Sequence, residues 1–336
     1  MTGDEAPVGT PTGVLVMSYG TPAGPDQVEG YYTHVRRGRP PTPELLADLR
    51  RRYQAIGGAS PLAERTRAQA MGLQAALDRR QPGRWRVFLG AKHAEPFIED
   101  GVAAMAGAGL RQGVALVLAP HYSALSVGEY LERAREAAAG AGIEMRAVES
   151  WHLAPGLIDL LARRLTDAMA GLPGDVAGAT EVLVTAHSLP ARILATGDPY
   201  QAQLLATAEA VTARAGVSRW RLAWQSAGRT PEPWLGPDIL DVIRGLPAEG
   251  VRGVVVCPAG FVSDHLEVLY DVDIEARRVA EEQGLVLSRT RSLDDDPHLV
   301  ETLAGLVTAA VPDAGRPAPS IHEGPSIDEL CRRRTT

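Results

Sequence analysis

Eight short apolar runs rich in β-branched residues constrain the fold of this chain more than any other feature of its sequence. Longer segments with helical periodicity, rich in Ala, Leu and Arg, alternate with these runs, which is typical of βα units and a parallel sheet. The runs are GVLVMSY (13–19), RVFLGAK (86–92), GVALVLA (113–119), IEMRAVES (143–150), EVLVTAH (181–187), RLAWQSA (221–227), GVVVCPA (253–259) and GLVLSRT (284–290). Four runs fall in each half of the chain, so we expect two similar α/β domains that face each other.

A length of 336 residues also favours two domains, because one core rarely serves a chain of this size. The stretch AGLPGDVAGAT at 170–180 reads as the connection between them. The predicted divisions are a flexible N-terminus (1–12), an N-terminal domain (13–172) with a helical insertion (21–80), a C-terminal domain (173–310) and a flexible tail (311–336).

Composition excludes several classes of protein. The net charge of −7 argues against a general binder of nucleic acid. No apolar stretch approaches the roughly 18 residues that a membrane-spanning helix needs, and the N-terminus lacks the pattern of a secretion signal. The two cysteines, Cys257 and Cys331, cannot supply the four thiolates of an all-cysteine [2Fe-2S] cluster. We therefore expect a cytoplasmic protein without such a cluster.

The ends of the predicted strands carry the reactive side chains. In open parallel sheets, ligands bind beyond the carboxyl ends of the strands. His187 and Glu267 follow two different runs of the second half, and an imidazole with a carboxylate can hold Fe²⁺ loosely enough to pass it on. Because His187 can also accept a proton, it is a candidate base as well as a candidate ligand.

Three carboxylates at four-residue spacing, Glu267, Asp271 and Glu275, share one face of a predicted helix. They have two interpretations. The ladder is either an ordinary solvated face opposite an apolar stripe, or a path of oxygen ligands for a hydrated cation that approaches from solvent.

Two clusters in the 21–80 insertion combine arginines with aromatic residues: YYTHVRRGR (31–39) and RRRYQAIGGASPL (50–62). Arginine binds carboxylates in a bidentate manner, and the aromatic neighbours suit a flat macrocycle that carries acid groups. The alternative is a helical hairpin with solvated arginines. Nucleotide binding and serine hydrolysis fit poorly, because neither phosphate-binding glycine motif follows the first run and GxSxG is absent.

Long colinear segments over roughly residues 13–310 resemble the ferrochelatases, and more closely the bacterial coproporphyrin ferrochelatases. The segments are LVMSYGTP (15–22), YYTHVRRGRPP (31–41), RRYQAIGGASPL (51–62), KHAEPFIED (92–100), LAPHYSALSVGEY (118–130), VTAHSLP (184–190), WQSAGRTPEPWLGPD (224–238) and GFVSDHLEVLYDVDIE (260–275). The resemblance implies the class II chelatase fold, in which two Rossmann-like domains enclose a porphyrin cleft, and it implies insertion of Fe²⁺ into the ring.

The same resemblance implies roles for individual residues. His187 and Glu267 match the family's metal-site pair, and Asp271 and Glu275 match the acidic path that leads outward from it. Tyr19 matches the tyrosine that approaches the metal from the opposite face of the ring. The remaining matches contact the tetrapyrrole and its propionates: Arg36, Arg52, Tyr53, Ser60 and Tyr130.

The substrate expected from the sequence is coproporphyrin III, with coprohaem as the product. Enzymes for the more apolar protoporphyrin IX commonly carry a hydrophobic lip, whereas this chain has only three Phe, no apolar C-terminal anchor and several arginines in the ring-binding region. The alternatives are a protoporphyrin IX ferrochelatase, a cobalt or nickel chelatase, and a haem carrier without catalysis. We expect a monomer that uses Fe²⁺ as a substrate, holds no permanent cofactor and binds no nucleic acid.

Overall fold

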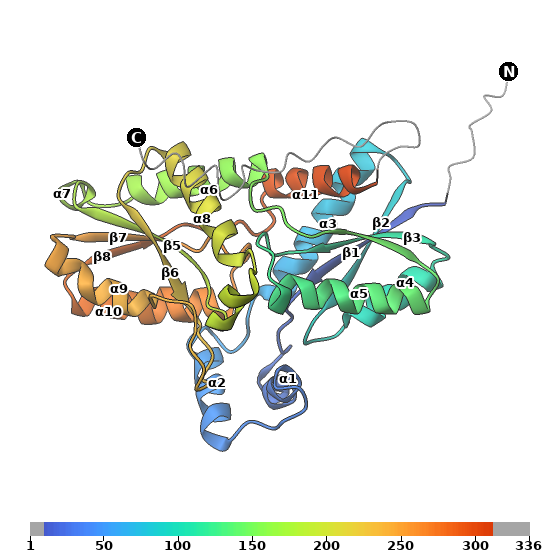
Figure 1. Cartoon of the computed structure of the whole chain (residues 1–336), viewed down its shortest axis with the longest axis horizontal. Helices are drawn as coiled ribbons and strands as arrows, with labels where there is room; N and C mark the ends of the chain where they lie inside the picture. Colours follow the sequence, from blue (N-terminus) through green and yellow to red (C-terminus); the bar gives the residue numbers. More distant parts are fainter. Residues whose placement is uncertain (1–9, 312–336) are drawn as a thin grey trace.

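The computed structural model describes residues 10–311 and contains two parallel sheets of four strands each (Figure 1). The predicted flexible ends fall mostly outside the described residues, as does Cys331. The first sheet has the order β2-β1-β3-β4 and the second the order β6-β5-β7-β8. The strands are β1 (Thr12–Ser18), β2 (Trp85–Ala91), β3 (Gln112–Val117), β4 (Glu144–Val148), β5 (Thr180–His187), β6 (Trp220–Gln225), β7 (Gly253–Cys257) and β8 (Val286–Arg289). All eight apolar runs therefore form strands, and the predicted α/β class with two parallel sheets is confirmed.

Burial explains why the runs of the four central strands are apolar over most of their length. The central strands are covered on both faces, so β1, β3, β5 and β7 are buried almost throughout. The helices are α1 (Val28–Val35), α2 (Pro43–Ala55), α3 (Leu62–Arg80), α4 (Ile98–Gly107), α5 (Glu129–Gly140), α6 (Pro155–Ala170), α7 (Gly174–Ala177), α8 (Tyr200–Ala215), α9 (Ile239–Gly245), α10 (Arg277–Glu282) and α11 (Pro297–Ala310). One π-helix follows β3, namely η2 (Ala124–Gly128), and another follows β7, namely η5 (Val268–Ala276). Three short 3₁₀ helices complete the elements: η1 (Pro25–Gln27), η3 (Ala191–Thr196) and η4 (Leu246–Glu249).

One core runs through both sheets on a shared face. It contains side chains of β1 and β3 together with those of β5 and β7, and it is covered by α3, α6, α8 and α11. The opposite face of the first sheet packs on α4 and α5, and that of the second packs on α9, η5 and α10. Because the shared core is continuous, the two sheets are held in a fixed relation to each other.

Two helices are exchanged between the halves. Helix α6 follows β4 in the chain but packs against β7, β8 and α8 of the second half, whereas the last helix, α11, packs against α3, β3 and β4 of the first (Figure 1). The exchange crosses residues 172 and 173, where the sequence places the domain boundary. The division at residues 172 and 173 stays a prediction, and it applies to the two sheets rather than to the helices that cover them.

The insertion between β1 and β2 contains three helices, of which α1 and α2 extend away from both sheets (Figure 1). Helix α2 begins where the Thr42 hydroxyl accepts a hydrogen bond from the Leu45 amide, and Pro43 occupies the first turn. Val28, Leu46 and Tyr53 form a small core there, and Leu266 from the second half packs against it. The insertion therefore contacts the loop that leads to Glu267. Among residues 10–311, none of the helices is long and apolar enough to cross a membrane.

Candidate active site

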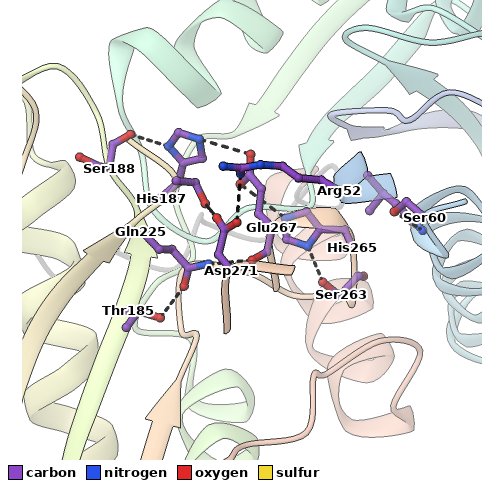
Figure 2. A network of polar contacts seen from close by, with 12 residues as sticks. Arg52, Ser60, Thr185, His187, Ser188, Gln225, Ser263, His265, Glu267 and Asp271 are labelled. Carbon is purple, nitrogen blue, oxygen red and sulfur yellow. Dashed lines mark hydrogen bonds and ion pairs between the residues drawn. The ribbon is translucent and has the colours of Figure 1, made fainter. Parts of the chain in front are cut away.

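The two residues predicted as a metal-site pair lie next to each other. His187 is the last residue of β5, a strand inside the second sheet. Its Nε2 lies 3.4 Å from Oε1 of Glu267, which stands at the start of the π-helix η5 (Figure 2). The Nδ1 atom of His187 contacts the Ser188 carbonyl, and the Tyr200 hydroxyl donates to the His187 carbonyl at 3.0 Å. His187 is thus held through both its side chain and its backbone.

The loop after β7 brings Glu267 to this position by crossing close over β5. The Gly260 amide donates to the Thr185 carbonyl at 3.0 Å. A Cβ atom at Gly260 would lie 2.4 Å from the Ala186 Cβ, so the crossing requires a glycine.

A second imidazole, His265, contacts the same carboxylate. Its Nε2 lies 3.7 Å from Oε2 of Glu267, and its Nδ1 is 2.9 Å from the Ser263 carbonyl (Figure 2). Glu267 therefore stands between two histidines. His265 was not predicted as a site residue, although it belongs to the DHLE segment that follows a strand end, and its closeness to Glu267 in the chain was the available signal.

Electrostatics make His187 and Glu267 an ion pair. Burial disfavours the charged imidazole, but the Glu267 carboxylate outweighs burial and raises the pKa of His187 to about 9. Burial likewise works against the Glu267 carboxylate, but His187 and then His265 hold its pKa well below the usual range. His187 is consequently an imidazolium at neutral pH. It must lose its proton before it can bind a metal or act as a base.

Asp271 lies one turn beyond Glu267 and is buried, with 6% of its surface exposed. The Ser226 hydroxyl donates to one of its oxygens, and Nη1 of Arg52 lies 3.4 Å from the other (Figure 2). Burial and then the charge of Glu267 raise the pKa of Asp271 to about 7. The solvated-face interpretation of the ladder is therefore wrong for Asp271, whereas Glu275, one turn further, is half-buried.

These acids do not form a ready-made metal centre. Between residues 10 and 311, the His, Cys, Asp and Glu side chains include no group of three or more placed to hold a metal ion. The pair of His187 and Glu267 supplies two ligands at most, which suits an ion that is passed on rather than stored.

A cavity of about 150 Å³ lies beside the pair, and Glu267 and His265 form part of its wall. Three predicted ring-binding residues also line it, namely Tyr19, Tyr53 and Ser60. The volume is below the roughly 300–1,000 Å³ of most small-molecule pockets. The remaining lining residues are Gly20, Thr21, Tyr31, Tyr32, Val35, Leu49, Leu62 and Leu266. The YYTHVRRGR segment thus contributes Tyr31 and Tyr32 to the wall. The residue of this segment that was predicted to bind the ring is Arg36.

The other three residues predicted to bind the ring are not part of this wall. Arg36 lies at the end of α1, where its Nε donates to the Arg39 carbonyl at 3.3 Å. Arg52 is paired with Asp271, and its Nε lies 3.2 Å from Asp48. Tyr130 is buried in α5, with the Lys92 ammonium 5.0 Å from the centre of its ring.

Comparison with known sequences identifies relatives over most of the chain. A sequence profile of the ferrochelatase family matches residues 11–311. A protein of Anoxybacillus flavithermus named coproporphyrin III ferrochelatase is 48% identical over 298 residues, which cover 88% of this chain and 95% of that protein. A protein of Herpetosiphon aurantiacus named ferrochelatase is 45% identical over 300 residues, with 88% and 98% covered.

Comparison with solved structures shows the same fold at low sequence identity. SirB from Bacillus subtilis, solved with Fe³⁺, superposes with a TM-score of 0.56 at 12% identity, and the match covers 89% of this chain and 95% of SirB. The sirohydrochlorin chelatase SirB from Bacillus subtilis subspecies spizizenii, in complex with cobalt, gives a TM-score of 0.53 at 13% identity with the same coverage.

Proposed function

This chain belongs to the ferrochelatase family of metal-chelating lyases, and on that premise we propose that it inserts Fe²⁺ into coproporphyrin III to give coprohaem. One observation carries the proposal: Glu267, which lies 3.4 Å from His187, lines a cavity together with four tyrosines. Aromatic walls suit the faces of a macrocycle, and an imidazole with a carboxylate suits Fe²⁺. Several relatives with 44–48% identity are named coproporphyrin III ferrochelatase, which favours this substrate.

The size of the cavity fits a substrate with polar edges. A space of about 150 Å³ encloses only part of a tetrapyrrole, so the rim of the ring extends beyond the tyrosine walls. Coproporphyrin III carries four propionates on that rim, and they remain in contact with water and with arginines of the insertion. Tyr19, with 42% of its surface exposed, stands at this cavity and can approach the metal from the ring face opposite His187.

The mechanism follows from the protonation of the pair. His187, whose side chain is 35% exposed, first gives up its proton to water, because an imidazolium offers no lone pair. The neutral imidazole and the Glu267 carboxylate then replace water on Fe²⁺. A grip that buckles the ring exposes the pyrrole nitrogens and so favours the geometry of the transition state over the flat substrate. As Fe²⁺ moves to the four nitrogens, two pyrrole protons leave, and His187 and Glu267 are the nearest acceptors on this face.

Asp271 and Glu275 are proposed to guide the cation toward Glu267. Asp271 is the next carboxylate along η5, and Glu275 is near enough to contribute to its raised pKa. Arg52 contacts one oxygen of Asp271, so the route requires Arg52 to exchange its partner. The absence of a permanent cofactor, the monomeric state and the cytoplasmic location stay predictions from the sequence.

Anaerobic mixing of the purified, metal-free protein with Fe²⁺ and each porphyrin tests the proposal, with visible spectra followed over many turnovers. We expect turnover with coproporphyrin III to exceed that with protoporphyrin IX. Faster turnover of protoporphyrin IX would overturn the substrate, and faster insertion of Co²⁺ or Ni²⁺ than of Fe²⁺ would overturn the metal. A spectral shift on binding without turnover at catalytic protein concentrations would identify a carrier.

A further inference from the structure

The Gln225 side chain links the two strands and the π-helix that carry the site. Gln225 ends β6 and pairs in register with His187 at the end of β5. Only 1% of its surface is exposed. Its Oε1 accepts a hydrogen bond from the Thr185 hydroxyl at 2.9 Å, and its Nε2 donates to the Glu267 carbonyl at 3.1 Å (Figure 2). The two bonds fix the orientation of the amide, because a flipped amide would place its oxygen against the Glu267 carbonyl.

The Gln225 backbone holds the other member of the pair. The Ser188 amide donates to the Gln225 carbonyl at 2.7 Å, and the Ser188 carbonyl in turn contacts Nδ1 of His187. One residue is therefore bonded to the chain of Glu267 through its side chain and to the neighbour of His187 through its backbone.

We propose that Gln225 is a positioning residue that sets the placement of Glu267 relative to His187, and thereby the affinity of the pair for the incoming Fe²⁺. The inference rests on the proposed role of this pair as the metal site. Residues that hold metal ligands through hydrogen bonds change metal affinity by about 10–100-fold when they are replaced. Glu267 stands at the start of η5, where the Gln225 amide reaches the backbone that carries its side chain.

Burial makes this bond specific to an amide. A methionine at position 225 would fill nearly the same space without hydrogen bonds, but it would leave the Thr185 hydroxyl without its Gln225 acceptor and release the Glu267 carbonyl. The packing of the β6 end would be retained, so Gln225→Met lowers stability only through the groups that it leaves unpaired, while it frees the position of Glu267.

The chain offers a matched control in Gln203 on α8. Its Oε1 accepts from the Tyr122 amide at 2.7 Å and from the Ser150 hydroxyl at 2.9 Å, so it too bridges separate segments. None of these contacts involves His187 or Glu267. Gln203→Met therefore removes a comparable bridging amide away from the pair.

The test measures steady-state kinetics with Fe²⁺ and coproporphyrin III for both variants. Gln225→Met should raise the KM for Fe²⁺ about tenfold while kcat and the KM for the porphyrin change less than about twofold. Gln203→Met should leave the KM for Fe²⁺ within about twofold of the wild-type value. Binding of Co²⁺ alone, followed by its visible absorption, should weaken by the same factor in Gln225→Met, which measures affinity without turnover.

Thr185→Val gives a second and milder perturbation. It removes the donor that fixes the Gln225 oxygen and lets the amide turn, so the KM for Fe²⁺ should rise by about two- to fivefold. The double variant with Gln225→Met should be no worse than Gln225→Met alone, because both changes act through one contact. If Gln225→Met does not fold, as judged by circular dichroism, the test rests on Thr185→Val. An unchanged KM for Fe²⁺ in Thr185→Val would then overturn the proposal.

Two failures can be told apart. If His187→Ala abolishes insertion but Gln225→Met has the same KM for Fe²⁺ as Gln203→Met, the positioning role is wrong and the metal site stands. If His187→Ala inserts Fe²⁺ at the wild-type rate, the proposed metal site itself is wrong. A loss of kcat in Gln225→Met with unchanged metal affinity would also contradict the positioning role.

Discussion

Arg52 and Asp271 form an ion pair that joins the helical insertion to the π-helix of the second half, with 3.4 Å between Nη1 and Oδ1. The sequence predicted different partners for both: substrate carboxylates for Arg52 and cations for Asp271. In the structure the two groups pair with each other. If Arg52 binds a propionate as proposed, the propionate and Asp271 compete for the same guanidinium.

We expect Arg52→Gln to weaken binding of coproporphyrin III about tenfold, because a charge-assisted contact to a carboxylate is lost. Fluorescence quenching of the metal-free porphyrin measures the Kd. Arg67→Gln is the control, since Arg67 is an exposed arginine on α3 outside the cavity wall and its loss changes the net charge equally. Equal affinities of the two variants would exclude Arg52 from ring binding.

Asp271→Asn should stabilise the protein at high pH. Burial raises the folded-state pKa of Asp271 to about 7, whereas the unfolded carboxyl titrates near 3.9. Between these values the folded state holds the extra proton, so the wild type loses stability as the pH rises from about 4 to 7. Asparagine avoids this loss, and the gain should be on the order of 1–3 kcal/mol above pH 7 and near zero at pH 4.

Thermal unfolding at pH 5 and pH 8 measures this difference as a shift in Tm of a few degrees. The exposed Asp295, replaced by Asn, serves as the control and should show no comparable dependence on pH. A gain for Asp271→Asn that is the same at both pH values would contradict a buried carboxyl with a raised pKa.

Glu267→Gln should lower the pKa of His187 from about 9 to below its ordinary value near 6.5, because burial then acts on the imidazolium without the compensating carboxylate. An NMR titration of the ¹⁵N-labelled imidazoles measures this directly. In the wild type, the stability that comes from the raised pKa of His187 is fully present below about pH 6.5 and is lost as the pH rises through about 9. Glu275→Gln should leave the titration of His187 near 9, and a fall as large as that in Glu267→Gln would point to the overall charge instead.

Asp271→Asn combined with Glu275→Gln should raise the Fe²⁺ concentration needed for the half-maximal rate, because two oxygen ligands of the proposed path lose their charge. The rate should be measured at saturating porphyrin, so that only the supply of metal varies. An unchanged dependence on Fe²⁺ would remove both residues from the path.

Local patterns were sufficient to predict the sheets, because the central strands are buried on both faces and their runs are largely apolar, as in β1 and β7. The same patterns could not predict the exchange of α6 and α11. An amphipathic helix carries no mark of which sheet it will cover, and that choice is made by packing between distant segments.

The site shows the same division. His187 and Glu267 could be predicted as neighbours because both follow strand ends in one sheet, and the structure places them 3.4 Å apart. The pairing of Arg52 with Asp271 could not be predicted, because it depends on the path of the insertion. The hydrogen bonds of Gln225 could not be predicted either, because they depend on the orientation of a buried amide. The sequence predicted a helix here but not that it is the π-helix η5, because the i→i+5 hydrogen bonds of a π-helix have no simple periodic pattern in the sequence.

The most direct test of the account is the rate of Fe²⁺ insertion by His187→Ala at saturating coproporphyrin III, measured beside the Kd for the porphyrin in the same preparation. Because the proposed role of His187 is at the metal rather than in holding the ring, the rate should fall by about 100-fold or more while the Kd stays within about twofold. An insertion rate equal to that of the wild type would contradict the assignment of His187 and, with it, the proposed metal site.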